Sequence, residues 1–177
     1  DDLGPYFRDL YAACDTQGIP VETAISEYAP GQLELTLRHR PDALRATDEA
    51  IMYKRAVKGV AIQHGVEATF MAKPFSDIAG SGMHLHVSLA DKAGRNAFAS
   101  EAPEGTELLK FAVGGMGALL NDSMAVFAPN ANSYRRFRAN SYAPVAPVWG
   151  INNRTCAFRI PAGAPHTRHI EHRVAGA

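Results

Sequence analysis

An α+β fold is predicted for this chain of 177 residues, because strand and helix patterns alternate irregularly instead of forming regular βαβ units. Three observations carry the prediction. Apolar residues recur at helical spacing over 2–14, leucines alternate with polar residues over 33–38, and a helical pattern runs from Thr47 to about His64. A chain of this length is about one domain in size and can bury a substantial core.

The first two elements are predicted from apolar spacing and from the residues that interrupt it. The helix over 2–14 is expected to stop at Gly18. Residues 19–39 are expected to form short strands that break at Pro30 and Gly31, a pair typical of turns. Thr47 is the predicted cap of the next helix, because a threonine hydroxyl can accept from a free backbone N–H.

The second half of the chain alternates short strands, turns and one glycine-containing helix. The predicted elements are a strand over 68–75, a strand over 82–90, a turn over 91–97 and a helix over 105–121. Pro74 ends the first of these strands, and Gly80 and Gly82 lead into the second. Loops and short strands follow to the C-terminus, without internal repeats or low-complexity segments.

Composition excludes several classes of protein. Hydrophobic residues make up 46% and charged residues 20% of the chain, as in soluble globular proteins. The formal net charge is zero, which argues against nucleic acid or a membrane as the partner of the whole chain. The longest apolar run, 111–120, is too short to span a bilayer. Two distant cysteines, Cys14 and Cys156, favour a reducing, cytoplasmic setting over a disulfide framework.

Charge is distributed unevenly along the chain. From Asn132 onward there are seven arginines, no lysine and a single acid, Glu171, a net charge of +6. Arginine without lysine favours planar, bidentate binding of carboxylates and phosphates. We therefore favour an anionic ligand for this segment over a solvated basic face.

Two glutamates flank the Pro30-Gly31 turn. On one straight strand Glu27 and Glu34 would point to opposite faces, but a chain reversal places them on adjacent strands, close enough to share a cation. For two glutamates alone, solvent-facing strand positions are the alternative.

The stretch GSGMHLHVSL contains two histidines two residues apart. On a strand His84, His86 and Ser88 share one face, and the face opposite is expected to point to the core. The core-facing residues would be Leu85, Val87 and Leu89. Exposed histidines without a ligand remain the alternative reading of this stretch.

Glu171 lies within RHIEHR, among neighbours that can all carry positive charge. These neighbours are Arg168, His169, His172 and Arg173, so the carboxylate is either their structural pairing partner or a ligand. An imidazole with several carboxylates suits manganese or magnesium, and a cation beside arginines is the layout of phosphoryl transfer. The chain has no GxxxxGK[ST] loop, which excludes P-loop chemistry.

Five motifs in this order and spacing resemble the catalytic domain of glutamine synthetases. They are EYAPGQLE, KPF followed by GSGMHLHVSL, NSYRRF, NNRTCAFRIP and RHIEHR, and the likeness extends from Glu27 to Arg173. The resemblance implies a curved antiparallel sheet, a partial barrel, with packed helices. Residues 1–177 would be the central part of that domain, without the family's N-terminal β-grasp-like domain, its acid-x-acid strand or its C-terminal helices. Such a segment can be inactive alone, and the full-length protein would be a homo-oligomer resembling the family's dodecamers.

The resemblance also implies roles for individual residues, and two or three Mg²⁺ or Mn²⁺ ions per site. The implied metal ligands are Glu27, Glu34, His84 and Glu171. The implied ATP-binding residues are His86, Ser88, Arg154, Arg159 and Arg168, with Arg154 and Arg159 also at the transferred phosphoryl group. The implied glutamate-binding residues are Gly80, Arg136 and Arg173. Tyr142 occupies the position of the family's general base.

The implied reaction is the ATP-dependent phosphorylation of the γ-carboxylate of glutamate, followed by attack of an amine. Ammonia-using members have a glutamate where this chain has Tyr142 and an asparagine where it has Ala79. A neutral phenol, with a reference pKa of about 10, is a weak base and binds a small cation poorly. Both changes resemble the γ-glutamyl-polyamine branch, so an amine such as putrescine is favoured. The alternatives are a glutamine synthetase using ammonia and a non-catalytic assembly protein, with a nucleic-acid-binding module the weakest.

Overall fold

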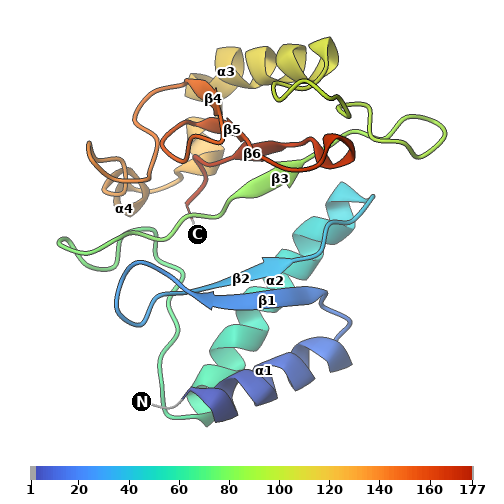
Figure 1. The fold of residues 1–177 in the computed structure, drawn as a ribbon. Helices are drawn as coiled ribbons and strands as arrows, with labels where there is room; N and C mark the ends of the chain where they lie inside the picture. The colour runs from blue at the N-terminus through green and yellow to red at the C-terminus, as the bar shows by residue number, and fades with distance from the viewer. Residues whose placement is uncertain (1–2, 177) are drawn as a thin grey trace. The chain divides into compact units, whose positions relative to one another are not determined.

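The computed structural model describes residues 3–176, which form two compact units that meet in sequence between Phe70 and Met71 (Figure 1). The first unit holds α1 (Gly4–Thr16), β1 (Val21–Ser26), β2 (Leu33–Leu37) and α2 (Ala43–Gln63). The second holds β3 (Leu85–Val87), α3 (Glu107–Phe127), α4 (Ala131–Tyr134), β4 (Trp149–Ile151), β5 (Phe158–Ile160), η1 (Pro165–Thr167) and β6 (Ile170–His172). This mixture confirms the predicted α+β class. Within the described residues, no helix is long and apolar enough to cross a membrane.

The first unit packs one face of a two-stranded sheet against two helices. β1 and β2 pair antiparallel and are joined by a turn in which Gly31 has φ +71°, a left-handed conformation that favours glycine. This confirms the predicted break. Leu35 and Leu37 pack against a core built from both helices, which includes Leu10 and Val60. The other face carries Glu34 and Thr36, and also Ile25, which is 46% exposed.

The second helix begins earlier than predicted. Asp42, not Thr47, is its N-cap, and the Asp42 carboxylate accepts from the backbone N–H of Arg45 at 3.1 Å. Thr47 lies inside the first turns, where its hydroxyl donates to the carbonyl of Ala43 at 2.8 Å. Pro41 disfavours the helical conformation for Arg40 before it, so the helix begins after the proline, with Asp42 as its cap.

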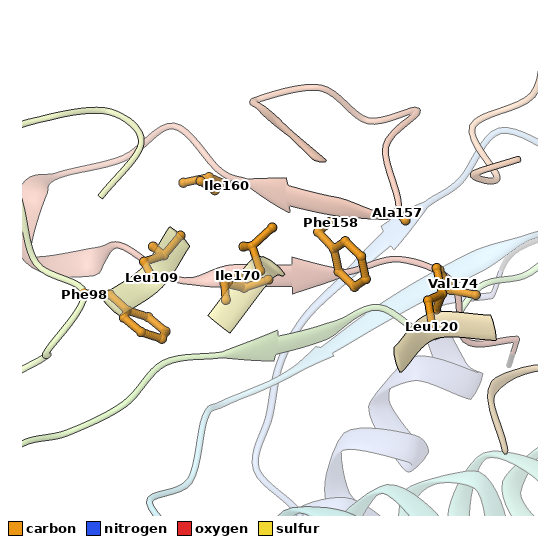
Figure 2. Close-up of a cluster of buried hydrophobic side chains, with 9 residues drawn as sticks. Phe98, Leu109, Leu120, Ala157, Phe158, Ile160, Ile170 and Val174 are labelled. Atoms are coloured by element: carbon orange, nitrogen blue, oxygen red, sulfur yellow. The ribbon is translucent and has the colours of Figure 1, made fainter. Parts of the chain in front are cut away.

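The second unit is built on a four-stranded sheet with the order β3-β6-β5-β4. β6 pairs antiparallel with β3 and β5, but β4 pairs parallel with β5, so the predicted antiparallel sheet is mixed. α3 covers one face of this sheet, and Figure 2 shows the apolar side chains between them. The buried cluster comprises Phe98, Leu109, Val113, Leu120, Ala157, Phe158, Ile160, Ile170 and Val174.

The predicted helix over 105–121 is present and continues to Phe127. Thr106 caps it by accepting from the backbone N–H of Leu109 at 3.4 Å. Gly114 and Gly115 do not interrupt it, and an added Cβ at either position would meet no atom within 4 Å. The turn predicted over 91–97 is also confirmed, by hydrogen bonds between Asp91 and Arg95.

The strand predicted over 68–75 is absent from this part of the structure. The backbone of Lys73 pairs instead with a side-chain amide: its N–H donates to Asn132 Oδ1 and its carbonyl accepts from Asn132 Nδ2, both at 2.8 Å. The strand predicted over 82–90 is regular only from Leu85 to Val87. Leu85 and Val87 pair with His172 and Ile170 on the core side of the sheet, which confirms the predicted facing for these two residues. Because β3 is an edge strand, Leu85 is still 36% exposed, and Leu89, beyond the strand, is 45% exposed.

Candidate active site

One face of the four-stranded sheet is polar and charged. The register places His86 opposite Glu171, and Glu171 opposite Arg159, in a single row across β3, β6 and β5. Paired residues on neighbouring strands project to the same side, while their strand neighbours Phe158 and Ile170 point to α3. The period of two thus separates a charged face from the apolar core.

Glu171 is the centre of this polar face. Its side chain is buried, and Oε2 lies 2.5 Å from Arg159 Nη1. Oε1 accepts from Arg173 Nη1 and lies 3.2 Å from His84 Nδ1. Burial by itself would raise the pKa of Glu171, but these cationic and hydrogen-bonding neighbours outweigh it and hold the pKa far below its usual range. The carboxylate is therefore ionised at any physiological pH.

His84 Nδ1 and Glu171 Oε1 are spaced as two ligands of one cation would be, although Arg173 Nη1 now contacts both atoms, at 3.4 Å from His84 Nδ1. Two donor atoms bound at about 2.1 Å in adjacent octahedral positions lie about 3 Å apart, and His84 Nδ1 and Glu171 Oε1 are separated by 3.2 Å. An ionised carboxylate has about four lone-pair directions, so it can keep its arginine partners and still bind an ion. Within residues 3–176, no group of three His, Cys, Asp or Glu side chains converges closely enough to hold a metal unaided.

Two arginines on this face keep an unused donor. The Nε–H groups of Arg159 and Arg173 are buried and meet no hydrogen-bond acceptor in the described part of the chain. A buried N–H without a partner costs free energy, and a bound ion, a water molecule or an anionic ligand would satisfy it. Their chemistry fits an anion with several oxygens, such as a phosphate or a carboxylate.

Arg136, predicted to bind glutamate, clamps the segment after β6. Its Nη1 donates to the carbonyl of Val174 and its Nη2 to that of Arg173, both at 2.7 Å. Burial, and secondly the charge of Arg173, lower the pKa of Arg136 to about 10. This structural task was not predicted, because nothing in the NSYRRF motif distinguishes the buried Arg136 from its exposed neighbour Arg135.

The glycines of the GSGMH stretch make room for this arginine. A Cβ on Gly82 would come within 2.9 Å of Arg136 Nη2, and a Cβ on Gly80 within 2.5 Å of the Ala72 carbonyl oxygen. Real Cβ atoms do not approach so closely, so both positions require glycine. Close packing, rather than a left-handed backbone, explains the residue type here.

The other predicted nucleotide ligands lie in different surroundings. Arg168 is buried and donates to the carbonyls of Ala102 at 3.3 Å and Gly163 at 3.1 Å, so it holds two loops together. Arg154 and Ser88 are exposed and accessible to a ligand. ATP binding by all three stays a prediction.

Glu27 and Glu34 share one face of the β1–β2 hairpin. Ile25 pairs with Glu34, and the Glu27 N–H donates to the Gln32 carbonyl at 2.9 Å, so the two glutamates are diagonal neighbours on the side away from the helices. The predicted reversal is confirmed. Metal binding by the pair stays a prediction.

Tyr142 and Ala79, the two departures from ammonia-using enzymes, lie on separate loops of the second unit. The side chain of Tyr142 is 61% exposed. Arg138, four residues before it, donates through Nη1 to the carbonyl of Ser76, three residues before Ala79, at 2.9 Å. One hydrogen bond thus connects the two loops.

His172 is not part of the charged face, although it is a neighbour of Glu171 in sequence. It is buried with its ring 4.3 Å from Phe127 and 5.2 Å from Phe158, and burial lowers its pKa. These surroundings disfavour the charged form that the sequence allows for this residue. Successive side chains on a strand point to opposite faces, so His172 faces the core while Glu171 and Arg173 lie on the charged face.

The chain resembles proteins of one family along its whole length. The whole chain, residues 1–177, matches the family described as "Glutamine synthetase, catalytic domain", and the chain belongs to that family. It is 46% identical over 96% of its length to gamma-glutamylputrescine synthetase PuuA of Escherichia coli, covering 36% of that protein. It is 40% identical over 99% of its length to glutamate–isopropylamine ligase of a Pseudomonas species, covering 37%.

Glutamine synthetases are also among the relatives. The chain is 39% identical over 94% of its length to the Thermotoga maritima glutamine synthetase, covering 38% of it. The chain therefore spans about a third of the length of the curated relatives it matches. The predicted family and fold are confirmed.

Proposed function

We propose that the full-length protein is an ATP-dependent ligase that joins the γ-carboxylate of glutamate to an amine. The observation that carries the proposal is the polar face of the sheet, where ionised Glu171 lies between two arginines and an imidazole. Buried donors on Arg159 and Arg173 fit the anionic oxygens of a phosphate and a carboxylate.

The reaction has two steps. An oxygen of the γ-carboxylate of glutamate attacks the terminal phosphorus of ATP, and ADP leaves. The amine nitrogen then attacks the acyl carbon, phosphate leaves, and the nitrogen loses a proton. When bound, Mg²⁺ or Mn²⁺ would neutralise phosphate oxygens.

The residues of this chain would position the reactants and balance their charge. His84 and Glu171 would hold one ion, and Glu27 and Glu34 would supply oxygen ligands to a further ion. Arg159, with exposed Arg154, would bind the phosphoryl group in transfer, because a guanidinium stabilises developing negative charge without having to give up a proton.

Arg173, together with Gly80, would contact the glutamate substrate. The Nε–H of Arg173 has no acceptor in the described part of the chain, but it is buried, so a carboxylate oxygen would reach it only if the side chains around it moved. Arg136 supports this role indirectly, because it holds the backbone carbonyl of Arg173 in place.

A polyamine such as putrescine is the acceptor we favour. Tyr142 offers an exposed aromatic ring, which can line a channel and attract an alkylammonium group modestly by a cation–π contact. The names of two relatives, gamma-glutamylputrescine synthetase and glutamate–isopropylamine ligase, agree with an organic amine. Ammonia is the second candidate, because relatives named glutamine synthetase are 37–39% identical to the chain.

The decisive experiment is an amine panel on the full-length protein. ADP release would be measured with ATP, glutamate and Mn²⁺ or Mg²⁺, using ammonium, putrescine, spermidine, ethanolamine and isopropylamine in turn. Reactions without glutamate provide the control for contaminating ATPase activity. We expect turnover with a diamine or polyamine and little with ammonium.

Other outcomes of the panel would overturn parts of the proposal. Turnover with ammonium alone would make the protein a glutamine synthetase. Failure of every amine, together with failure to bind Mn²⁺ and ATP, would indicate a non-catalytic assembly protein that kept the fold.

A further inference from the structure

Residues 73–80 form a loop that leads into the GSGMH stretch and is held in place by hydrogen bonds. Its two ends meet where the Ser81 N–H donates to the carbonyl of Ala72 at 2.8 Å. In its middle, Arg138 Nη1 donates to the carbonyl of Ser76 at 2.9 Å. These contacts act on the backbone, so the loop is held without burying the side chains at its tip.

The loop presents an aromatic ring and a carboxylate to solvent. Phe75 is 62% exposed, and Asp77 is exposed as well. The Asp77 carboxylate accepts from the hydroxyl of its neighbour Ser76. Three acids of the second unit form ion pairs within the described residues, namely Asp91, Glu107 and Glu171. Asp77 is not among them.

Two basic side chains contact the loop, but neither of them pairs with Asp77. Lys73 Nζ donates to the carbonyl of Ile78, and Arg138 donates to that of Ser76. Backbone carbonyls on either side of Asp77 thus engage both cations. The Asp77 carboxylate stays available to a cation from outside the chain.

The position of Asp77 connects it with the residues that distinguish this chain from ammonia-using enzymes. Ala79 is two residues further along the loop, and Gly80, the expected glutamate contact, is three. Three residues span at most about 11 Å. The Arg138 hydrogen bond joins this loop to that of Tyr142, whose ring is also exposed. One carboxylate and two exposed aromatic rings therefore belong to a pair of connected loops.

A diamine differs from ammonia and monoamines in carrying a second charge. One nitrogen must be neutral to attack the acyl carbon, but the other stays protonated at neutral pH, since an alkylammonium group has a pKa of about 10. A cation–π contact stabilises an exposed ammonium group only modestly. A charge-assisted hydrogen bond to a carboxylate is stronger, so a site that selects diamines gains most from an acid at the far end of the substrate.

We infer that Asp77 binds the second ammonium group of a diamine or polyamine acceptor, and that Phe75 packs against the methylene chain. The inference rests on the proposed function, because it takes the amine to bind beside the loops of Ala79 and Tyr142. It makes Asp77 a specificity-determining residue, which favours diamines over monoamines and ammonium.

The test compares two acceptors on the full-length protein. Putrescine and n-butylamine have the same carbon chain, but only putrescine carries a second ammonium group. Steady-state kinetics would be measured for both with Asp77→Asn, Asp77→Glu and the control Asp122→Asn, which removes an exposed acid on α3. Calorimetric titration of both amines, with glutamate and a non-hydrolysable ATP analogue present, would measure binding without turnover.

Asp77→Asn should lower kcat/KM for putrescine by about 10-fold, the effect of losing one exposed charge-assisted hydrogen bond. It should leave n-butylamine within about twofold of the wild type. Asp77→Glu keeps the charge one methylene further out, so it should restore much of the loss and shift the preferred diamine towards the shorter 1,3-diaminopropane. Asp122→Asn should change neither acceptor, and the KM for ATP should be constant throughout.

Three results would overturn the inference. They are unchanged putrescine kinetics in Asp77→Asn, an equal loss for putrescine and n-butylamine, and a wild type that does not prefer putrescine to n-butylamine. If no amine supports turnover, the proposed function fails and calorimetry decides the inference separately. Weaker binding of putrescine alone in Asp77→Asn would then support it, and a wild type that binds no putrescine would contradict it.

Discussion

Glu171 and Arg173 form an ion pair between side chains two residues apart at the end of β6, and each residue is only 2% exposed. Alternation along the strand puts both on the same face. Glu171 also pairs with Arg159, so one carboxylate balances two guanidinium groups. The stability of the second unit and the chemistry of the candidate site therefore depend on the same residue.

Glu171→Gln should destabilise the protein strongly. The substitution keeps the shape but leaves two buried guanidinium charges without a counter-charge, and breaking a buried ion pair from one side costs about 3–5 kcal/mol. Urea unfolding of the full-length protein would measure the change. Glu107→Gln, which removes an exposed ion pair to Lys110 on α3, is the matched control and should leave the unfolding midpoint unchanged.

Acid should remove the stabilising contribution of Glu171. Its pKa is lower in the folded protein than in the unfolded chain, so this contribution is complete well above the ordinary carboxyl value of 4.5 and declines as pH falls below it. The difference in unfolding free energy between wild type and Glu171→Gln should therefore shrink from about pH 6 towards about pH 3. The decrease follows the uptake of one proton by the carboxyl group in the unfolded chain. A difference that stays constant over that interval would contradict the assigned ion pair.

Gly80→Ala should destabilise the protein by about 1–3 kcal/mol, the range for overpacking a close contact. The added Cβ would meet the Ala72 carbonyl oxygen at 2.5 Å, and that carbonyl also accepts from the Ser81 N–H at 2.8 Å, so neither can move freely. Thermal or urea unfolding checks the effect. Gly115→Ala on α3, where an added Cβ has open space, should instead stabilise the protein by up to about 1 kcal/mol.

Arg138→Ala should affect the amine substrate more than ATP. Its hydrogen bond to Ser76 connects the loops of Tyr142 and Ala79. Such a bond is worth about 1 kcal/mol, so its loss corresponds to about a fivefold rise in the KM for the amine. Steady-state kinetics with each substrate varied in turn would measure this. Arg95→Ala, which removes an exposed ion pair with Asp91 in a turn, should leave every KM unchanged.

Tyr142→Glu should shift acceptor preference towards ammonium. A carboxylate attracts a small cation and can take its proton, whereas a neutral phenol does both poorly. The ratio of kcat/KM for ammonium to that for putrescine should rise, with the KM for ATP serving as the internal control. A ratio that does not change would remove Tyr142 from the determinants of amine choice.

Local sequence patterns predicted much of this structure. The alternating leucines before Arg38 and the turn at Gly31 predicted the hairpin that carries Glu27 and Glu34. Both patterns depend only on residues close together in the sequence. The motifs around His84 and Glu171 likewise located the polar face.

Other features depend on partners distant in sequence and were not predictable in this way. The strand expected around Lys73 is replaced by a pairing with the side chain of Asn132, which no local pattern reveals. The same holds for the Arg136 clamp and for the bond between His86 and His169, whose partners are 83 residues apart.

The pairing of β3 with β6 also has a consequence for how the protein folds. His86 and His169 are separated by 83 residues, and Arg173 and His84 by 89, so the polar face forms only when the two ends of the second unit meet. Closing so long a loop is costly in entropy and slow compared with forming α3 from local contacts. During refolding, helical signal should therefore recover first, and affinity for Mn²⁺ should return with the slowest phase.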